Sequence, residues 1–373
     1  MHVLWQESAL ERVRKCCHTP HTNRGVGVKR SFTGERGTRA GFSGLITCGS
    51  VWACPKCAEK ILTGRQQEIE RGLAAWTAGG GKVGLFTFTM RHRQGQPLAW
   101  LWKGLSHGWA SVTEGMPWVR QQEKFGSPTP RVVKRGKRAG DTVVENKIPW
   151  IRVTEVTVGE NGWHAHIHVA VLLPAWATSE SAAELGSLMF ARWSTALKAY
   201  GTAAPLEHRG GLDAKLWNGE TGVLSNYFTK QDYAATAAKA AMELTRGDYK
   251  EARRGNRTPF RLLNDLVRDG LADDLDLWHE YERASKGHRQ CTWSAGLKAR
   301  LQVAEVEDQE LAEQDMGGEE VLLLPYDTWQ WIRRGRQECA FLEAVEQSIE
   351  AAEQWLRGRD LGWSRPPVKQ AGG

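Results

Sequence analysis

Residues 162–173, GWHAHIHVAVLL, decide the fold and the candidate site. Three histidines stand at every second position of an otherwise apolar run: His164, His166 and His168. Because alternate residues of a β-strand share a face, the three imidazoles are expected on one side. The apolar residues between them would then face a packed core. The pattern predicts a strand with one buried face and one functional face.

The preceding residues predict the partner of this strand. Residues 150–158, WIRVTEVTV, read as a second strand, and the sequence GENG at 159–162 is a strong hairpin turn signal. With Glu160 and Asn161 as the loop residues, the register places Glu155 directly opposite His166. Opposed side chains lie within about 5.5 Å at Cβ. One carboxylate and two imidazoles on one face suit a divalent cation with open coordination positions. The alternative is a set of half-exposed histidines with ordinary hydrogen-bond partners.

The rest of the chain mixes helices with strands. Residues 82–90, KVGLFTFTM, predict a buried strand with alternating Phe and Thr. Residues 119–141 are polar and basic and predict an exposed loop or an extended hairpin. Helices are expected at 59–76, 96–112, 179–200 (with Ser179 or Ser181 as cap), 224–244, 271–287 and 338–357. Residues 247–263 are expected to form a basic turn that enters another helix. This order predicts an α+β fold, a mainly antiparallel sheet with helices packed on it.

Five of the seven cysteines fall within the first 57 residues. Cys54 and Cys57 form a C-x-x-C pair, Cys48 lies six residues earlier, and Cys16 or Cys17 can supply a fourth thiolate. His18 and His21 are further candidates. Without a secretion signal a disulfide framework is not expected. The spacing favours structural Zn²⁺ bound by Cys16, Cys48, Cys54 and Cys57, over a redox pair or free thiols. The isolated Cys291 and Cys339 are expected in the core.

Charge is unevenly distributed along the chain. The net charge is +7, yet residues 301–373 contain seven Lys and Arg against fifteen Asp and Glu. A basic body with an acidic tail is typical of nucleic-acid binding, although solvated surface charge gives the same balance. Two basic segments are candidate phosphate contacts: Arg131, Lys134, Arg135, Lys137 and Arg138, and Arg253, Arg254 and Arg257. No apolar run approaches the ~18 residues of a membrane span, and the N-terminal residues lack the order of charge, apolar stretch and cleavage site of a secretory signal. We therefore expect a cytoplasmic protein without a membrane partner.

A tyrosine on a later segment adds a candidate nucleophile. Tyr227 and Lys230 are three residues apart on a predicted helix and would share a face. A phenol with a pKa of about 10 is a poor nucleophile unless its phenolate is stabilised. A bound metal and a nearby ammonium would help, by polarising the phosphate and stabilising negative charge. The alternatives are a partly buried Tyr227 beside a surface lysine, and Tyr233 as the nucleophile.

Several segments together resemble the replication initiator (Rep) proteins of rolling-circle plasmids, particularly the actinobacterial ones. These segments are FTFTMRH (86–92), EVTVGENGWHAHIHVAV (155–171), YFTK (227–230), CGSVWACPKCAEKI (48–61), RTPFRLL (257–263) and residues 278–301. The resemblance covers roughly residues 14–301. Two positions depart from the family pattern: the family more often has Pro at the position of Ala165, and some relatives have Tyr where Gln231 stands.

The resemblance implies a His-hydrophobic-His (HUH) endonuclease with a central antiparallel sheet. His166 and His168 would bind Mg²⁺ or Mn²⁺, with Glu155 as the third ligand from the register. His164 and His92 would flank the metal or contact phosphate. Tyr227, assisted by Lys230, would nick and rejoin single-stranded DNA at a plasmid origin through a 5′-phosphotyrosine. Host helicase and polymerase would be partners.

Three other functions compete with this interpretation. A related HUH transposase or relaxase would use the same chemistry on another substrate. A non-catalytic, zinc-stabilised DNA-binding repressor would need neither the tyrosine nor Glu155. A histidine-triad nucleotide hydrolase would explain HAHIHVA but not the cysteines. The expected organisation is a zinc-binding module at 1–60, a catalytic domain at 61–301 and an acidic, mainly helical region at 302–373.

Overall fold

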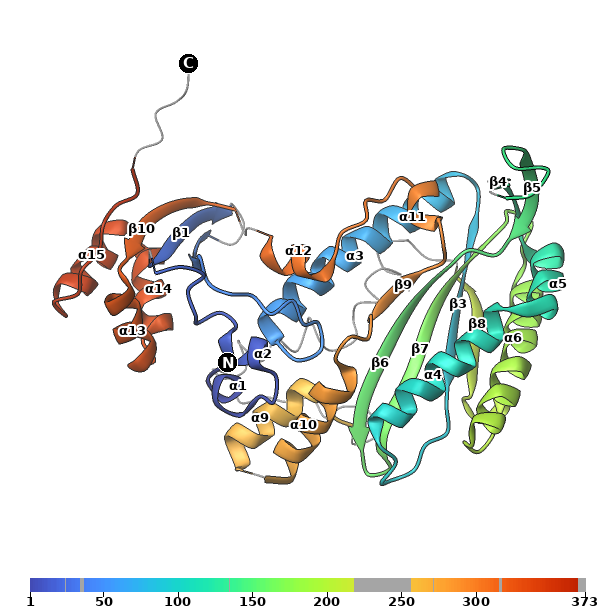
Figure 1. Ribbon diagram of the computed structural model, residues 1–373, viewed down its shortest axis with the longest axis horizontal. Coiled ribbons are helices and arrows are strands. Elements are labelled where there is room, and N and C mark those ends of the chain that lie inside the picture. The colour runs from blue at the N-terminus through green and yellow to red at the C-terminus, as the bar shows by residue number, and fades with distance from the viewer. Residues whose placement is uncertain are drawn as a thin grey trace, which may run out of the picture.

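The structure is a computed structural model that describes residues 1–23, 25–33, 37–133, 135–217, 256–270, 272–314 and 317–367. It contains a five-stranded, a three-stranded and a two-stranded sheet, and every strand pair in them is antiparallel. Helices flank the largest sheet on both sides (Figure 1). The predicted α+β fold class, with a central antiparallel sheet, is confirmed.

The five-stranded sheet has the order β8-β3-β7-β6-β9. Its strands are β3 (Lys82–Thr89), β6 (Trp150–Gly159), β7 (Gly162–Leu173), β8 (Leu212–Trp217) and β9 (Cys291–Trp293). The β6–β7 hairpin closes through the Gly159↔Gly162 pair, and Gly162 has φ +80°, which favours glycine. Glu155 pairs with His166, so the register predicted from the turn is confirmed.

Alternation along the strands separates two faces of this sheet. On one face, Ile69 and Leu73 of α3 (Pro55–Ala78) pack in a cluster with Leu85 and Val153. On the other face, Phe86 and its alternate neighbours join a larger core with three helices: α4 (Leu98–Thr113), α5 (Gly115–Phe125) and α6 (Ser179–Tyr200). In Figure 1, α3 lies on one side of the sheet and α4 and α6 on the other. Both faces are therefore packed, and each face of the sheet belongs to its own hydrophobic cluster.

Two local expectations need correction. Thr178, not a serine of the helix, is the N-cap of α6, and Ser181 bonds back to it in a capping box. Residues 119–125 belong to α5 rather than to a loop, because Trp118, Gln121, Gln122 and Phe125 form one buried stripe. The two glutamines made that stripe look polar in sequence. The hairpin predicted after it is formed by β4 (Ser127–Val132) and β5 (Thr142–Lys147).

The ends of the chain share a three-stranded sheet with the order β10-β1-β2. Its strands are β1 (Val26–Thr33), β2 (Gly37–Ser43) and β10 (Glu319–Leu324), and three helices pack on it: α13 (Tyr326–Arg334), α14 (Glu338–Gln347) and α15 (Ile349–Arg357). The single helix expected at 338–357 is two helices, because Ser348 has an extended backbone and caps α15. Residues 1–60 and 302–373 thus pair directly, and the three-domain division stays a prediction.

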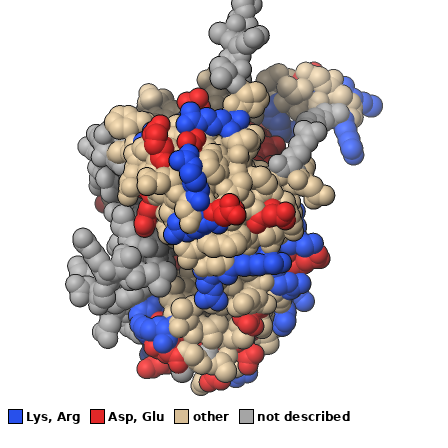
Figure 2. Space-filling model, turned by 90° about the vertical axis from the view of Figure 1, so that its left-hand side faces the viewer, with Lys and Arg blue, Asp and Glu red and all other residues tan. Residues whose placement is uncertain are grey.

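The remaining elements are short or lie beside the main sheet. They are α1 (His2–Glu7), α2 (Glu11–Lys15), the 3-10 helix η1 (Glu207–Arg209), α9 (Pro259–Asp269), α10 (Ala272–Ser285), α11 (Leu297–Arg300) and α12 (Asp308–Glu313). Figure 2 shows that basic and acidic side chains are interspersed on the side of the molecule that carries the chain ends. No helix within the described ranges is both long and apolar enough to cross a membrane.

Candidate functional site

Three side chains meet on the face of the β6–β7 hairpin that the sequence singles out. Glu155 Oε2 lies 2.8 Å from His166 Nε2 and 3.2 Å from His168 Nε2. The two Nε2 atoms are 3.1 Å apart. Their potential ligand atoms all lie within 4.8 Å of one another. The strand pairing that the sequence predicts therefore brings one carboxylate oxygen and two imidazole nitrogens to a common centre.

The pKa shifts of Glu155 and His168 fit metal binding. Burial raises the pKa of Glu155, but hydrogen bonds from His166 and His168 outweigh it and hold that pKa well below its usual range. Burial lowers the pKa of His168, which favours the neutral ring. An ionised Glu155 carboxylate and a neutral His168 imidazole are forms that bind metals. The group could hold a divalent cation, and three donors on one face leave positions open for a substrate.

Thr87 orients one of these histidines. Its Oγ1 is 2.9 Å from His168 Nδ1, across the β3–β7 pairing. This hydrogen bond engages Nδ1 and leaves Nε2 facing Glu155. Such outer partners fix the orientation of a ligating imidazole and strengthen metal binding. The alternation of Phe and Thr in residues 86–89 was the available signal, since it puts Thr87 on the histidine face; sequence reasoning missed this role.

His164 and His92 form a pair beside the three-residue group. His92 Nε2 lies 2.9 Å from His164 Nδ1, and His92 Nδ1 lies 3.1 Å from the carbonyl oxygen of Asn161. The rings of His164 and His166 have centroids 4.9 Å apart. Burial, and then the nearby His166, lower the pKa of His164 to about 3, so its ring is neutral at pH 7. The pair extends the row of imidazoles, but its nitrogens do not join the potential ligand group.

A second potential metal site lies in the N-terminal region. The potential ligand group consists of Cys16, Cys48, Cys54 and Cys57, all buried. The Sγ–Sγ separation is 3.6 Å for three pairs: Cys16–Cys57, Cys48–Cys57 and Cys54–Cys16. Zn–S bonds of about 2.3 Å in a tetrahedron give edges of about 3.8 Å, so the spacing fits zinc. The structure describes all seven cysteines, and none of them forms a disulfide.

Local backbone structure explains how these thiols meet. Cys54 is the N-cap of α3 and Cys57 lies in its first turn, so the C-x-x-C pair is held at the start of a long helix. Cys16 follows α2, and Trp5 Nε1 donates to its carbonyl oxygen at 2.8 Å. Cys17 has φ 59° and is not part of the group, although its Sγ is 3.6 Å from that of Cys16.

The other cysteines, and the candidates His18 and His21, lie outside this group. Cys291 is partly buried against the α3 side of the sheet, whereas Cys339, at the start of α14, is exposed. The expectation of a core position is therefore wrong for Cys339. His18 packs against Trp5, and His21 is exposed.

Several predicted site residues lie outside the described residues: Tyr227, Lys230, Lys134, Arg253 and Arg254. Of the basic residues that are described, Arg135 is exposed, and Arg131 pairs with Glu145 at 2.6 Å. Arg257 is bound internally, at 3.1 Å from Asp265 and 2.8 Å from Asp274. Its DNA-contact role stays a prediction, as do those of the other basic residues.

Comparison with known proteins identifies two related sequences. The chain is 34% identical over 306 residues to "Protein rep" from Streptomyces lividans, and this alignment covers 71% of the chain and 66% of that protein. It is 34% identical over 137 residues to "Neomycin resistance protein" from Streptomyces cyanogenus, covering 35% of the chain and 31% of that protein. The chain thus spans just under two thirds of the first relative and about a third of the second.

No family model matches the chain, and no solved structure matches it. The long alignment with the Streptomyces lividans protein extends over most of the chain and agrees with the resemblance predicted from the motifs. The alignment makes the chain a relative of a Streptomyces Rep protein.

Proposed function

We propose that this protein starts rolling-circle plasmid replication by nicking and rejoining single-stranded DNA at the plasmid's double-strand origin. The observation that supports the proposal is the convergence of Glu155, His166 and His168 on one face of the β6–β7 hairpin, in a chain related to a Rep protein. We propose cytoplasmic action, with plasmid origin DNA as substrate and host helicase and polymerase as partners.

The side chains of the sheet would prepare one phosphate for attack. When bound, Mg²⁺ or Mn²⁺ would withdraw charge from a non-bridging phosphate oxygen. Glu155, His166 and His168 would hold that ion, and Thr87 would fix the ring of His168. His164 and His92 lie next to the same group, where the His164 Nδ1 and His92 Nε2 hydrogen bond keeps both rings in place. They would flank the phosphate.

The nucleophile is proposed from the sequence alone. The Tyr227 phenolic oxygen would form a bond to phosphorus while the bond between phosphorus and the 3′-oxygen breaks. The 3′-oxygen would leave as a hydroxyl after taking up a proton, and the phosphate would remain on the tyrosine as a 5′-phosphotyrosine. Lys230 would stabilise the phenolate. The free 3′ end would prime synthesis, and a later 3′-hydroxyl would reverse the step and close the displaced strand.

The other proposals concern metal and DNA contacts. We propose that structural Zn²⁺ is bound by Cys16, Cys48, Cys54 and Cys57. We also propose three domains: a zinc-binding module at 1–60, a catalytic domain at 61–301 and an acidic, mainly helical region at 302–373. Lys134, Arg135, Arg253, Arg254 and Arg257 are proposed phosphate contacts. A related transposase or relaxase would share the site and differ in its DNA.

The decisive experiment uses labelled single-stranded origin DNA with and without Mn²⁺. We expect the wild-type protein to form a metal-dependent covalent adduct that survives denaturation, and Tyr227→Phe to form none. Tyr233→Phe is the matched control and should keep the adduct. An undiminished adduct with Tyr227→Phe would remove Tyr227 from the mechanism, and no adduct with the wild type would favour a non-catalytic DNA-binding repressor.

A further inference from the structure

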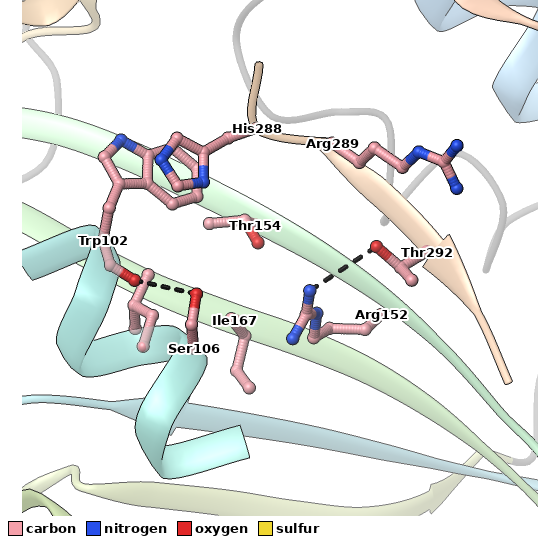
Figure 3. Close-up of a pocket in the computed structure, with 9 residues that line it drawn as sticks. Trp102, Ser106, Arg152, Thr154, Ile167, His288, Arg289 and Thr292 are labelled. Carbon is pink, nitrogen blue, oxygen red and sulfur yellow. Dashed lines mark hydrogen bonds between the residues drawn. The ribbon is translucent and has the colours of Figure 1, made fainter. Parts of the chain in front are cut away.

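A pocket lies on the face of the sheet opposite to Glu155 and the histidines. It is lined by Trp102, Leu105, Ser106, Arg152, Thr154, Ile167, His288, Arg289 and Thr292, and has a volume of about 240 Å³. Arg152 and Thr154 alternate with Glu155 along β6, so their side chains point to the α4 side of the sheet (Figure 3). The pocket is therefore separated from the candidate metal site by the sheet itself.

Arg152 lacks the partners that a guanidinium of this burial needs. Its Nη2 donates one long hydrogen bond of 3.5 Å to Thr292 Oγ1, its Cζ lies 5.7 Å from the ring of Trp109, and its Nε is buried without a hydrogen bond. Within the described residues no carboxylate forms an ion pair with it. Burial lowers the pKa of Arg152 to about 10, so the side chain still carries its charge at pH 7. Buried charges in proteins are ordinarily paired, because desolvating an unpaired charge is costly.

The other polar groups of the pocket suit an anion. Hydroxyls of Ser106, Thr154 and Thr292 line it, and Arg289 lies at its exposed edge, with only a distant contact of 3.9 Å to Glu307. Among the residues that the structure describes, no Asp or Glu lines the pocket. Guanidinium and hydroxyl donors together are the groups that bind phosphate oxygens.

The size and shape of the pocket limit the occupant. Its volume is below the roughly 300–1,000 Å³ of pockets that hold drug-sized ligands, so one tetrahedral group fits better than a whole nucleotide. The rings of Trp102 and His288 stack on each other with centroids 4.2 Å apart and an angle of 9°, which leaves no slot for a base between them (Figure 3).

We propose that this pocket is a second phosphate-binding site, in which the Arg152 guanidinium pairs with one phosphate group away from the nicking site. The phosphate belongs either to the backbone of bound DNA or to a small soluble phosphate compound. The proposal does not depend on the nicking chemistry, because no group of the candidate metal site takes part.

The test measures binding of radiolabelled inorganic phosphate by equilibrium dialysis, without added divalent metal and at constant ionic strength. We expect the wild type to bind about one phosphate per chain and Arg152→Met to bind it about tenfold more weakly or worse. Arg71→Met removes an exposed arginine from α3, on the other side of the sheet, and should bind as the wild type does. His166→Ala should also keep the binding, because it changes only the opposite face.

Two further measurements sharpen the result. Because no carboxylate of the described residues pairs with Arg152, Arg152→Met should melt at the same temperature as the wild type or higher in phosphate-free buffer. An oligonucleotide of twelve thymidines should displace the labelled phosphate if the natural ligand is DNA. In that case the slope of log Kd for the oligonucleotide against log salt concentration should be smaller by about 0.7 in Arg152→Met than in the wild type, since one phosphate contact is lost. If the oligonucleotide leaves the label bound, the phosphate source is a soluble compound.

The proposal is overturned by any of three results. The wild type does not bind phosphate, Arg152→Met binds it as well as the wild type does, or His166→Ala loses it. A clear lowering of the melting temperature of Arg152→Met in phosphate-free buffer, together with unchanged phosphate binding, would assign Arg152 a structural role. A failure of the adduct experiment on Tyr227 would leave all of these outcomes unchanged, so the two proposals fail separately.

Discussion

The cysteine cluster and the histidine face are two potential metal sites of opposite design. The four thiols are all buried, come from segments up to 41 residues apart, and form a complete set of four ligands. Glu155, His166 and His168 come from one hairpin and supply three ligands on one side. A closed set of four sulfurs is typical of structural zinc, whereas an incomplete set with open positions is typical of catalytic metals.

The two sites also differ in what stabilises their geometry. The cysteine cluster joins three segments, the end of α2, the residues after β2 and the start of α3, so a bound ion would cross-link them within the core. The histidine hairpin is already held by β3 and by the packed residues on its other face, so its geometry does not require an ion. Removing metal should therefore unfold the first region and only inactivate the second.

The largest effect is expected for Cys54→Ser. Structural zinc contributes about 10–16 kcal/mol to the folding of zinc-finger peptides, so loss of one ligand should remove zinc and unfold the N-terminal region. We expect zinc content, measured by mass spectrometry, to fall from about one per chain to near zero, and the melting temperature to drop sharply. The control Cys339→Ser changes an exposed cysteine and should keep both values. Full zinc content in Cys54→Ser would refute the four-thiolate site.

The next effect, on activity rather than on folding, is expected for His166→Ala. Under the proposed mechanism, loss of one of the three ligands should reduce the rate of the DNA adduct on the order of 100-fold or more, because a metal would no longer be held where it can polarise the phosphate. The melting temperature should change little, since the strand pairing and its packed face remain. His208→Ala removes an exposed histidine of η1 and is the matched control. Unfolding of His166→Ala would show that the two sites do not differ in the way described above.

The sequence predicted the parts of this contrast that depend on local rules. The turn at Glu160 and Asn161 determines the strand register, and the register alone placed Glu155 against His166. The cysteine spacing identified the zinc candidates in the same way. Both inferences use residues that are close in the chain or linked by one hairpin, where geometry follows from the pattern of residues.

Long-range packing could not be predicted in this way. The pairing of β1 with β10 places Val26 opposite Leu324, and the sequence of neither strand indicates which strand it pairs with. The choice of Cys16 over Cys17 depends on the backbone conformation at Cys17, which two identical neighbours do not reveal. The unpaired charge of Arg152 was equally hidden, because it depends on which side chains of α4 and β9 surround it.

A smaller effect is expected for Thr87→Val. Replacing the hydroxyl removes the hydrogen bond to His168 Nδ1 while keeping the shape of the side chain, so His168 loses its fixed orientation. Outer partners of this kind change metal affinity about 10–100-fold, and we expect the Kd for Mn²⁺, measured by calorimetry, to rise within that range. Thr89→Val is the matched control, because the Thr89 hydroxyl donates to the carbonyl oxygens of Gly210 and Gly211 instead. Equal Mn²⁺ affinity in Thr87→Val and the wild type would show that the hairpin alone orients His168.

The smallest effect is expected for Cys17→Ser, and it tests how closed the cysteine cluster is. Cys17 Sγ lies as close to Cys16 Sγ as two of the other thiols do, so distance alone would make it a fifth ligand. A tetrahedral zinc has no position for it, and the four buried thiols already complete the set. Cys17→Ser should keep its zinc and lose no more than about 0.5 kcal/mol of unfolding free energy, measured by urea denaturation. Cys16→Ser should behave like Cys54→Ser. Zinc loss in Cys17→Ser but not in Cys16→Ser would exchange the two residues and place the ion nearer the surface, which would weaken the contrast between a closed and an open site.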